Sequence, residues 1–284
     1  MQLLRLILAA LVLVTTATTS PATESEKLEE SVCGFFREPF AFWTWSIAAG
    51  TPNPATAGQV PNAEPMVHRT KDGRLLRGYK LRSTATDGAV IGSILVAQGN
   101  AMLADQLLSS LAGFSRAGLD VYIFDYRGYG GSEGNRRLKA MVSDYQELFA
   151  RIGASAKGKR FLYGISFGGV VLLNVVGSGI DFDRAVIDST PSRVSHLGCP
   201  EQYDPVVNFP KDGARFLLIA GEQDTVVPRQ SSQDLLDVAE TRGGRAIVRP
   251  DYAHPFMDSN ADIHSERLDL IRAFFAGTEG LEAR

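Results

Sequence analysis

The sequence predicts an α/β protein with a mostly parallel central sheet and helices on both faces. Short apolar runs alternate with segments of helical spacing over residues 74–278, and this alternation is typical of parallel sheets covered on both sides. The chain has 284 residues, 44% of them hydrophobic, which suffices for a large core without a metal. Its net charge is -3 and it contains no basic block, so we expect no nucleic-acid partner.

The expected strands are short, apolar and followed by glycine or polar residues. They cover residues 74–83, 88–98, 120–126, 160–166, 182–190, 214–221 and 244–251. The expected helices carry apolar residues at intervals of three and four. They cover residues 102–118, 138–154, 167–179, 232–241 and 262–277. Residues 191–213 are interrupted by prolines and show little helical pattern, which predicts a short cap segment in place of a large lid.

The N-terminus predicts an exported protein. Arg5 precedes nine apolar residues, 6–14, and small and hydroxyl residues follow. Nine residues are too few to span a bilayer, which needs about 20, so residues 1–22 are typical of a secretory signal peptide. The alternative is an uncleaved membrane anchor. Export to the periplasm or the exterior would let Cys33 and Cys199 pair, but the sequence leaves open whether they do.

Residues 23–73 precede the main domain at 74–278 and form an arm of unusual composition. Residues 34–46 contain six aromatic residues, Phe35, Phe36, Phe40, Phe42, Trp43 and Trp45. Such a segment either packs on the main domain or forms a patch for a membrane surface or a substrate. Residues 50–66 contain four prolines and are expected to form a loop.

Two segments fit the pattern Gly-x-Ser-x-Gly, which marks a nucleophilic serine on a sharp turn between a strand and a helix. In "GISFG", residues 164–168, an apolar strand leads in and an apolar helix leads out. In "GGSEG", residues 130–134, the serine lies in a long glycine-rich loop. The context therefore favours Ser166 as the nucleophile and makes Ser132 a loop residue.

A serine nucleophile needs a base, and the base needs a carboxylate to orient it. In this type of sheet the acid and then the histidine follow the serine along the chain. Asp224 comes directly after an apolar strand and is preferred to its neighbour Glu222, while His254 lies in the loop before the last helix. His264 falls within that helix, His196 in an irregular segment, and His68 before the sheet, so none of the three is preferred as the base.

Backbone N–H groups should stabilise the negative charge that develops on the substrate oxygen. One donor is expected from Phe167, which follows the nucleophile at the start of its helix. The second is expected from the loop "QGNA", where Asn100 is preferred and Ala101 is the next choice.

Five segments in order resemble the α/β-hydrolase superfamily: "QGNA", "DYRGYGGSEG", "GISFGG", "GEQDTVVP" and "AHPFM". They are similar to its small serine hydrolases with Gly-Asn-Ala and Asp-Tyr-Arg-Gly-Tyr-Gly loops, over about residues 75–276. The resemblance implies an α/β-hydrolase fold and the roles given above for Ser166, Asp224, His254, Asn100 and Phe167. It also implies small ester, thioester or other acyl substrates and no metal or organic cofactor.

The resemblance has one notable departure and leaves several functions open. Gln98 stands where the superfamily usually has histidine before the oxyanion loop. We expect a serine esterase, thioesterase or lipase-like enzyme that forms an acyl-enzyme. The alternatives are an aminopeptidase-like amidase, a cofactor-free perhydrolase or haloperoxidase, and a non-catalytic binding protein, since a fold does not fix a function.

Overall fold

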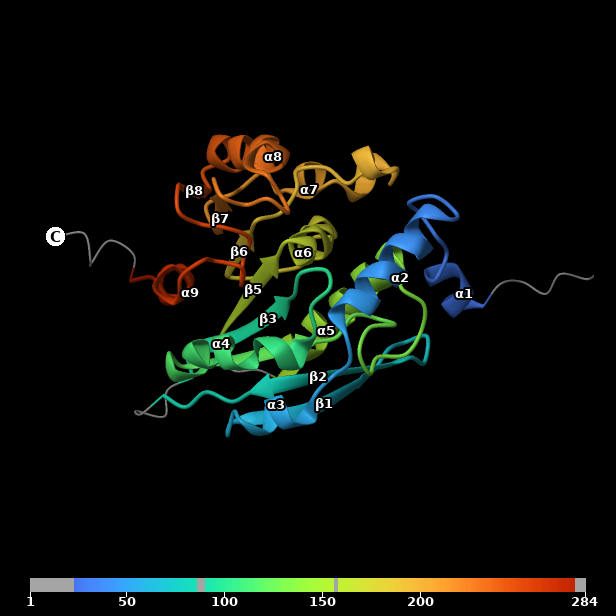
Figure 1. Cartoon of the computed structure of the whole chain (residues 1–284), viewed down its shortest axis with the longest axis horizontal. Helices are drawn as coiled ribbons and strands as arrows, with labels where there is room; N and C mark the ends of the chain where they lie inside the picture. The colour runs from blue at the N-terminus through green and yellow to red at the C-terminus, as the bar shows by residue number, and fades with distance from the viewer. Residues whose placement is uncertain (1–22, 86–89, 156–157, 279–284) are drawn as a thin grey trace, which may run out of the picture.

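The computed structural model of the chain describes residues 23–85, 90–155 and 158–278, so the expected signal peptide at residues 1–22 lies outside the described residues. Eight strands form one sheet in the order β1-β2-β4-β3-β5-β6-β7-β8 (Figure 1). The first two strand pairs in this order are antiparallel and all the others are parallel. The strands are β1 (Ala63–Arg69), β2 (Leu75–Leu81), β3 (Gly92–Ala97), β4 (Leu119–Phe124), β5 (Lys159–Ile165), β6 (Arg184–Asp188), β7 (Phe216–Gly221) and β8 (Arg245–Arg249).

Helices cover both faces of the sheet, as the apolar strands require. They are α1 (Glu24–Leu28), α2 (Arg37–Ala49), α3 (Pro54–Gly58), α4 (Ala104–Arg116), α5 (Leu138–Ser155), α6 (Phe167–Gly177), α7 (Pro205–Asn208), α8 (Arg229–Thr241) and α9 (Ala261–Ala276). One core lies under α4 and α9 and includes Phe114 and Phe275. The other lies under α5, α6 and α8 and includes Tyr145, Leu172 and Leu235. The predicted fold class is confirmed.

The loop predicted for residues 50–66 is wrong in part. Asn53 caps α3, with Pro54 at the first helical position, where a missing N–H costs nothing. The strand β1 then pairs with β2 and contains Pro65. A proline fits there because β1 is an edge strand, where no second neighbour needs its N–H. The sheet therefore starts at Ala63 rather than at residue 74.

The cap between β6 and β7 is short. It contains two 3₁₀ turns, Ser195–Leu197 and Glu201–Tyr203, and the single turn of α7. Asp204 stabilises it, because its carboxylate accepts hydrogen bonds from the N–H groups of Val194 and Ser195.

Two buried carboxylates and a disulfide attach the N-terminal arm to the domain. Glu38 on α2 accepts hydrogen bonds from the N–H groups of Cys33 and, at the start of α5, Leu138. Glu29 pairs with Arg127, which is fully buried. Cys33 is bonded to Cys199 of the cap, which answers the question that the sequence left open. Figure 1 shows α1 and α2 together beside α5, so the arm is an integral part of this side of the molecule.

Candidate active site

Ser166 lies on a strained turn between β5 and α6. Its φ of 54° and ψ of -117° belong to a region of backbone conformation that residues other than glycine rarely adopt. The two flanking glycines make this turn feasible. A Cβ on Gly168 would lie 1.9 Å from the carbonyl oxygen of Ala97, and one on Gly164 would lie 2.7 Å from the Cα of Gly169. The turn therefore exists because both positions lack side chains.

The hydroxyl of Ser132, the serine of the other glycine motif, makes two hydrogen bonds to backbone groups. It accepts a hydrogen bond from the Arg77 N–H and donates one to the Asp125 carbonyl, both at 2.9 Å. These bonds fasten its loop to β2 and to the residue that follows β4, which is a structural use of the hydroxyl.

Asp224 and His254 meet at the carboxyl end of the sheet. His254 Nδ1 lies 2.8 Å from Asp224 Oδ2. The other carboxylate oxygen accepts hydrogen bonds from the N–H groups of Val226 and Val227, at 2.9 and 2.8 Å. Burial acts to raise the pKa of Asp224, but the hydrogen bonds from His254 and the Val227 N–H outweigh burial and hold that pKa below its ordinary value. Asp224 is therefore an ionised partner for the imidazole at neutral pH.

The remaining carboxylate and histidines that the sequence offered lie in other settings. Glu222, the rival acid, is exposed and pairs with Arg229. His264 lies on α9 near Asp258, with a Nδ1–Oδ2 distance of 3.7 Å. His196 lines an apolar cavity beside the site but has no contact with Asp224 among the described interactions. His68 lies on β1, away from these residues.

The segment before α4 is held by side chains of the loop after β4. Tyr126 donates a hydrogen bond to the Gln98 carbonyl at 2.6 Å, and Tyr129 donates one to Asn100 Oδ1 at 2.8 Å. The buried amide of Gln98 donates to the Phe124 carbonyl at 2.9 Å. Gln98, which stands where histidine was expected, is thus fully buried, and its amide supports the backbone of the neighbouring strand end.

A cavity of about 490 Å³ opens above Ser166. Asn100, Ala101, Phe167 and His254 line it as well, so the predicted nucleophile, base and oxyanion segments face one space. Phe167 is the first residue of α6, where a helix presents its unpaired N–H groups. The arrangement can support attack of a hydroxyl on an acyl carbon with charge stabilisation from backbone donors.

A second, apolar cavity of about 390 Å³ adjoins the first. The two share the side chains of Trp45, Phe167, Val194 and Leu197. Phe42 and the Cys33–Cys199 disulfide line the second cavity. The wall of the site is therefore built in part by the N-terminal arm.

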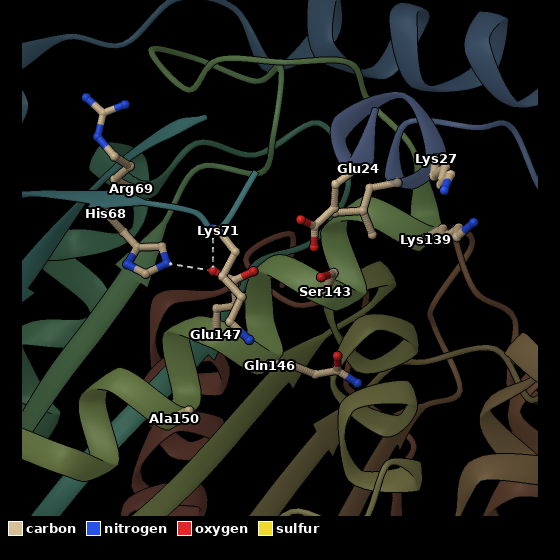
Figure 2. A pocket seen from close by; sticks show the side chains of 11 residues that line it. Glu24, Lys27, His68, Arg69, Lys71, Lys139, Ser143, Gln146, Glu147 and Ala150 are labelled. Carbon is tan, nitrogen blue, oxygen red and sulfur yellow. Dashed lines mark hydrogen bonds and ion pairs between the residues drawn. The ribbon is translucent and has the colours of Figure 1, made fainter. Parts of the chain in front are cut away.

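A third cavity, of about 560 Å³, has a different character. It lies between α1, β1 and α5 and is lined by charged side chains that include Lys27, Lys71 and Lys139 (Figure 2). Figure 2 shows His68 Nε2 directed at the Glu147 carboxylate, at 3.6 Å. Burial and the nearby Arg151 lower the pKa of His68, so this imidazole is a neutral structural group.

Sequence patterns missed the network that supports the loop of His254. Arg267, fully buried on α9, donates a hydrogen bond to the Ala253 carbonyl at 3.0 Å and pairs with Asp258 at 3.2 Å. Asp258 in turn accepts a hydrogen bond from the Ala253 N–H. Asp188 lies 3.5 Å from Arg267 Nε. An arginine in an otherwise amphipathic helix carries no signal of burial, so only the fold reveals this role.

Comparison with known proteins gives a consistent result. The family model described as serine aminopeptidase, S33, matches residues 88–203. The uncharacterized protein YfhR of Escherichia coli K12 is 30% identical over 228 residues, which cover 73% of this chain and 79% of that protein. The uncharacterized protein Rv2307c of Mycobacterium tuberculosis is 27% identical over 249 residues, covering 80% of this chain and 84% of that protein.

Solved structures share the fold at low sequence identity. The Pyrococcus furiosus esterase Pf2001 superposes with a TM-score of 0.63 at 15% identity, over 80% of this chain and 96% of that chain. An alpha-beta hydrolase from Vibrio vulnificus superposes with a TM-score of 0.65 at 15% identity, over 83% of this chain and 92% of that chain.

Proposed function

Because this chain belongs to the α/β-hydrolase superfamily and is a hydrolase of that fold, we propose that it is a serine hydrolase of ester and related acyl bonds. Ser166 is the nucleophile, His254 the base and Asp224 the acid that orients it. The observation that carries this proposal is the 2.8 Å contact between His254 and Asp224 beside a cavity that both His254 and Ser166 line.

The proposed reaction runs through an acyl-enzyme. Ser166 Oγ attacks the carbonyl carbon while His254 Nε2 takes the hydroxyl proton, and the C–O π electrons move to the carbonyl oxygen. That oxygen is stabilised by the N–H groups of Asn100 and Phe167, each worth roughly 3 kcal/mol in the transition state. The C–O bond to the leaving group then breaks and His254 protonates the departing alkoxide. Water repeats the sequence, releasing the acid and restoring Ser166.

The lining of the cavity favours acyl substrates over aminoacyl ones. Its side chains are mostly apolar and include Val194, Val226 and Met257, with no aspartate or glutamate among them. A free α-ammonium group would therefore find no carboxylate there, and burying an unpaired charge is costly. The adjoining apolar cavity offers room for a hydrocarbon acyl chain. These features support an esterase over an aminopeptidase, the activity in the description of the matching family.

The proposed site of action is outside the cytoplasm. The Cys33–Cys199 disulfide supports export, because disulfides persist in oxidising compartments. The apolar run at residues 6–14 supports it as well, by resembling a signal peptide.

Labelling with a fluorophosphonate probe tests the nucleophile. We expect the wild type to be labelled, Ser166→Ala to be unlabelled, and the matched control Ser132→Ala to be labelled like the wild type. If the folded wild type did not react, the protein would be a binding protein rather than a hydrolase. If only Ser132→Ala lost labelling, the nucleophile would be Ser132 and the assignment of Ser166 would be wrong.

A substrate panel tests the bond type. p-Nitrophenyl esters of increasing acyl length and aminoacyl p-nitroanilides are compared by kcat/KM. We expect turnover of the esters to exceed that of the anilides and to rise with acyl length beyond acetate. Faster turnover of the anilides would make the enzyme an amidase, and peroxide-dependent oxidation faster than ester turnover would make it a perhydrolase.

A further inference from the structure

The outer face of α2 is an exposed apolar stripe. Four of its side chains stand largely in solvent: Phe36 at the N-cap is 80% exposed, Phe40 66%, Trp43 52% and Ile47 58%. They are spaced by four, three and four residues, which places them along one side of a helix. Large side chains aligned in this way form a continuous patch, and monomeric soluble proteins seldom leave such a patch uncovered.

The charges of α2 are distributed unevenly around the helix. Its one acidic residue, Glu38, is only 2% exposed and binds backbone N–H groups on the inner side. The one exposed charged residue of the helix is Arg37, whose guanidinium also reaches the Leu197 carbonyl at the cap. The outward face therefore presents apolar groups and a cation, and the helix has no exposed carboxylate to repel an anionic surface.

We propose that α2 docks on a lipid surface through Phe36, Phe40, Trp43 and Ile47. Phenylalanine, tryptophan and isoleucine on one face are typical of helices that lie in the membrane interface, and tryptophan favours the level of the lipid headgroups. Apart from Arg37 and the partly exposed Thr44, whose hydroxyl already donates to the Ala41 carbonyl, the outer face is apolar, whereas a protein partner is normally met by several hydrogen bonds. The charge distribution fits phospholipids, which are anionic or zwitterionic.

The inner face of the same helix supports a functional reason for this docking. Ala41, Phe42 and Trp45 line the apolar cavity next to the candidate site. Leu197, which lines both cavities, is itself exposed at the cap near Arg37. A lipid surface on the stripe would thus lie one helix diameter from the cavity, about 10 Å, and substrates with apolar chains would reach it from the lipid phase. This last step rests on the proposed function, but the docking does not.

Vesicle binding by the full-length chain tests the docking without any substrate. The protein is mixed with vesicles of phosphatidylcholine, alone or with phosphatidylglycerol, and separated by flotation. We expect it to float with both and more strongly with the anionic mixture. The triple variant Phe36→Ser, Phe40→Ser, Ile47→Ser should bind on the order of tenfold or more weakly. The matched control Val67→Ser, Val90→Ser, Ile91→Ser changes exposed apolar residues of β1 and of the segment before β3, outside the stripe, and should float like the wild type.

Fluorescence identifies the surface that meets the lipid. The chain contains two tryptophans, Trp43 and Trp45, and only Trp43 is on the stripe. Vesicles with brominated acyl chains should quench the emission of the wild type, and Trp43→Phe should lose most of this quenching while still floating.

Three outcomes would overturn the docking proposal. They are a wild type that stays unbound, a stripe variant that floats equally well because residues 1–22 alone carry the binding, and a stable dimer in solution that the stripe variant converts to a monomer. Hydrolysis of a soluble p-nitrophenyl ester should remain within about twofold in the stripe variant. A wild type that binds vesicles but shows no esterase activity would instead contradict the proposed function and leave the docking proposal standing.

Discussion

The imidazole of His254 and the carboxylate of Asp224 are joined at 2.8 Å, although 30 residues separate them along the chain. The second oxygen of the carboxylate is held by two backbone N–H groups, so the orientation of the pair is fixed before any substrate binds. This preorganisation is what a general base beside a serine requires.

Asp224→Asn should lower kcat about 10⁴-fold with little change in KM, because the amide no longer holds the reactive imidazole tautomer or stabilises the imidazolium. Glu222→Gln is the control: Glu222 lies two residues away, is exposed and pairs with Arg229, so its loss should leave kcat unchanged. Steady-state kinetics on a p-nitrophenyl ester compares the two variants. Equal losses in both would contradict the assignment of the acid.

Tyr129→Phe should reduce kcat several-fold at constant KM. The variant keeps the buried ring and removes only the hydroxyl that donates to Asn100 Oδ1, a bond worth about 1 kcal/mol. The oxyanion segment then loses orientation in the transition state rather than affinity for the substrate. Tyr252→Phe serves as control, since the Tyr252 hydroxyl is buried and has no hydrogen-bond partner within the described part of the chain. A change in KM alone would indicate that Tyr129 acts on binding.

Gly168→Ala should destabilise the fold by more than about 3 kcal/mol, because the added Cβ would lie 1.9 Å from the Ala97 carbonyl oxygen and β3 would have to move. Gly58→Ala adds the same atom where nothing lies within 4 Å, so it should be neutral. Chemical denaturation of both variants measures the difference. A fully stable Gly168→Ala protein would show that the turn at Ser166 is looser than described.

Removal of the Cys33–Cys199 disulfide by a double serine substitution should cost about 2–5 kcal/mol, since the bond closes a long loop with a separation of 166 residues. It should also raise KM for long-chain esters more than for acetate, because Cys33 and Cys199 line the apolar cavity. Thermal melts with and without reductant provide the check: the reductant should lower Tm of the wild type and leave the double variant unaffected.

Acid unfolding should depend on Asp72. Burial opposes its ionisation, but hydrogen bonds from Arg127 and Thr70 prevail and lower its pKa from 3.8 to about 2. Because the folded-state pKa lies below the unfolded one, this stabilisation is present above pH 4 and is lost as the pH falls toward 2. Asp144, whose pKa burial raises to about 6, is already protonated in that range.

Asp72→Asn should therefore flatten the loss of stability between pH 4 and 2 by about 2 kcal/mol. Urea titrations at several pH values in this range measure the effect. Parallel curves for the wild type and the variant would mean that the Arg127–Asp72 pair does not contribute to acid stability.

The amino-acid sequence was sufficient to predict the order of strands and helices in the main domain, and with it the superfamily. It could do so because the periodicity of apolar residues is a local property of the chain, and because Gly164 and Gly168 next to an apolar strand mark a turn that few other residues permit. For the same reason it singled out Ser166, Asp224 and His254, each of which follows a strand at the carboxyl edge of the parallel part of the sheet.

The surroundings of these residues became visible only in the folded chain. Pro65 is tolerated in β1 because β1 is an edge strand of the sheet. The disulfide joins the arm to the cap, and Arg267 supports the loop of His254. The fold also divides the aromatic residues of α2 between a cavity wall and an exposed stripe. Burial and pairing of this kind depend on contacts between segments that are distant in the chain, and the local composition of a segment does not predict such contacts.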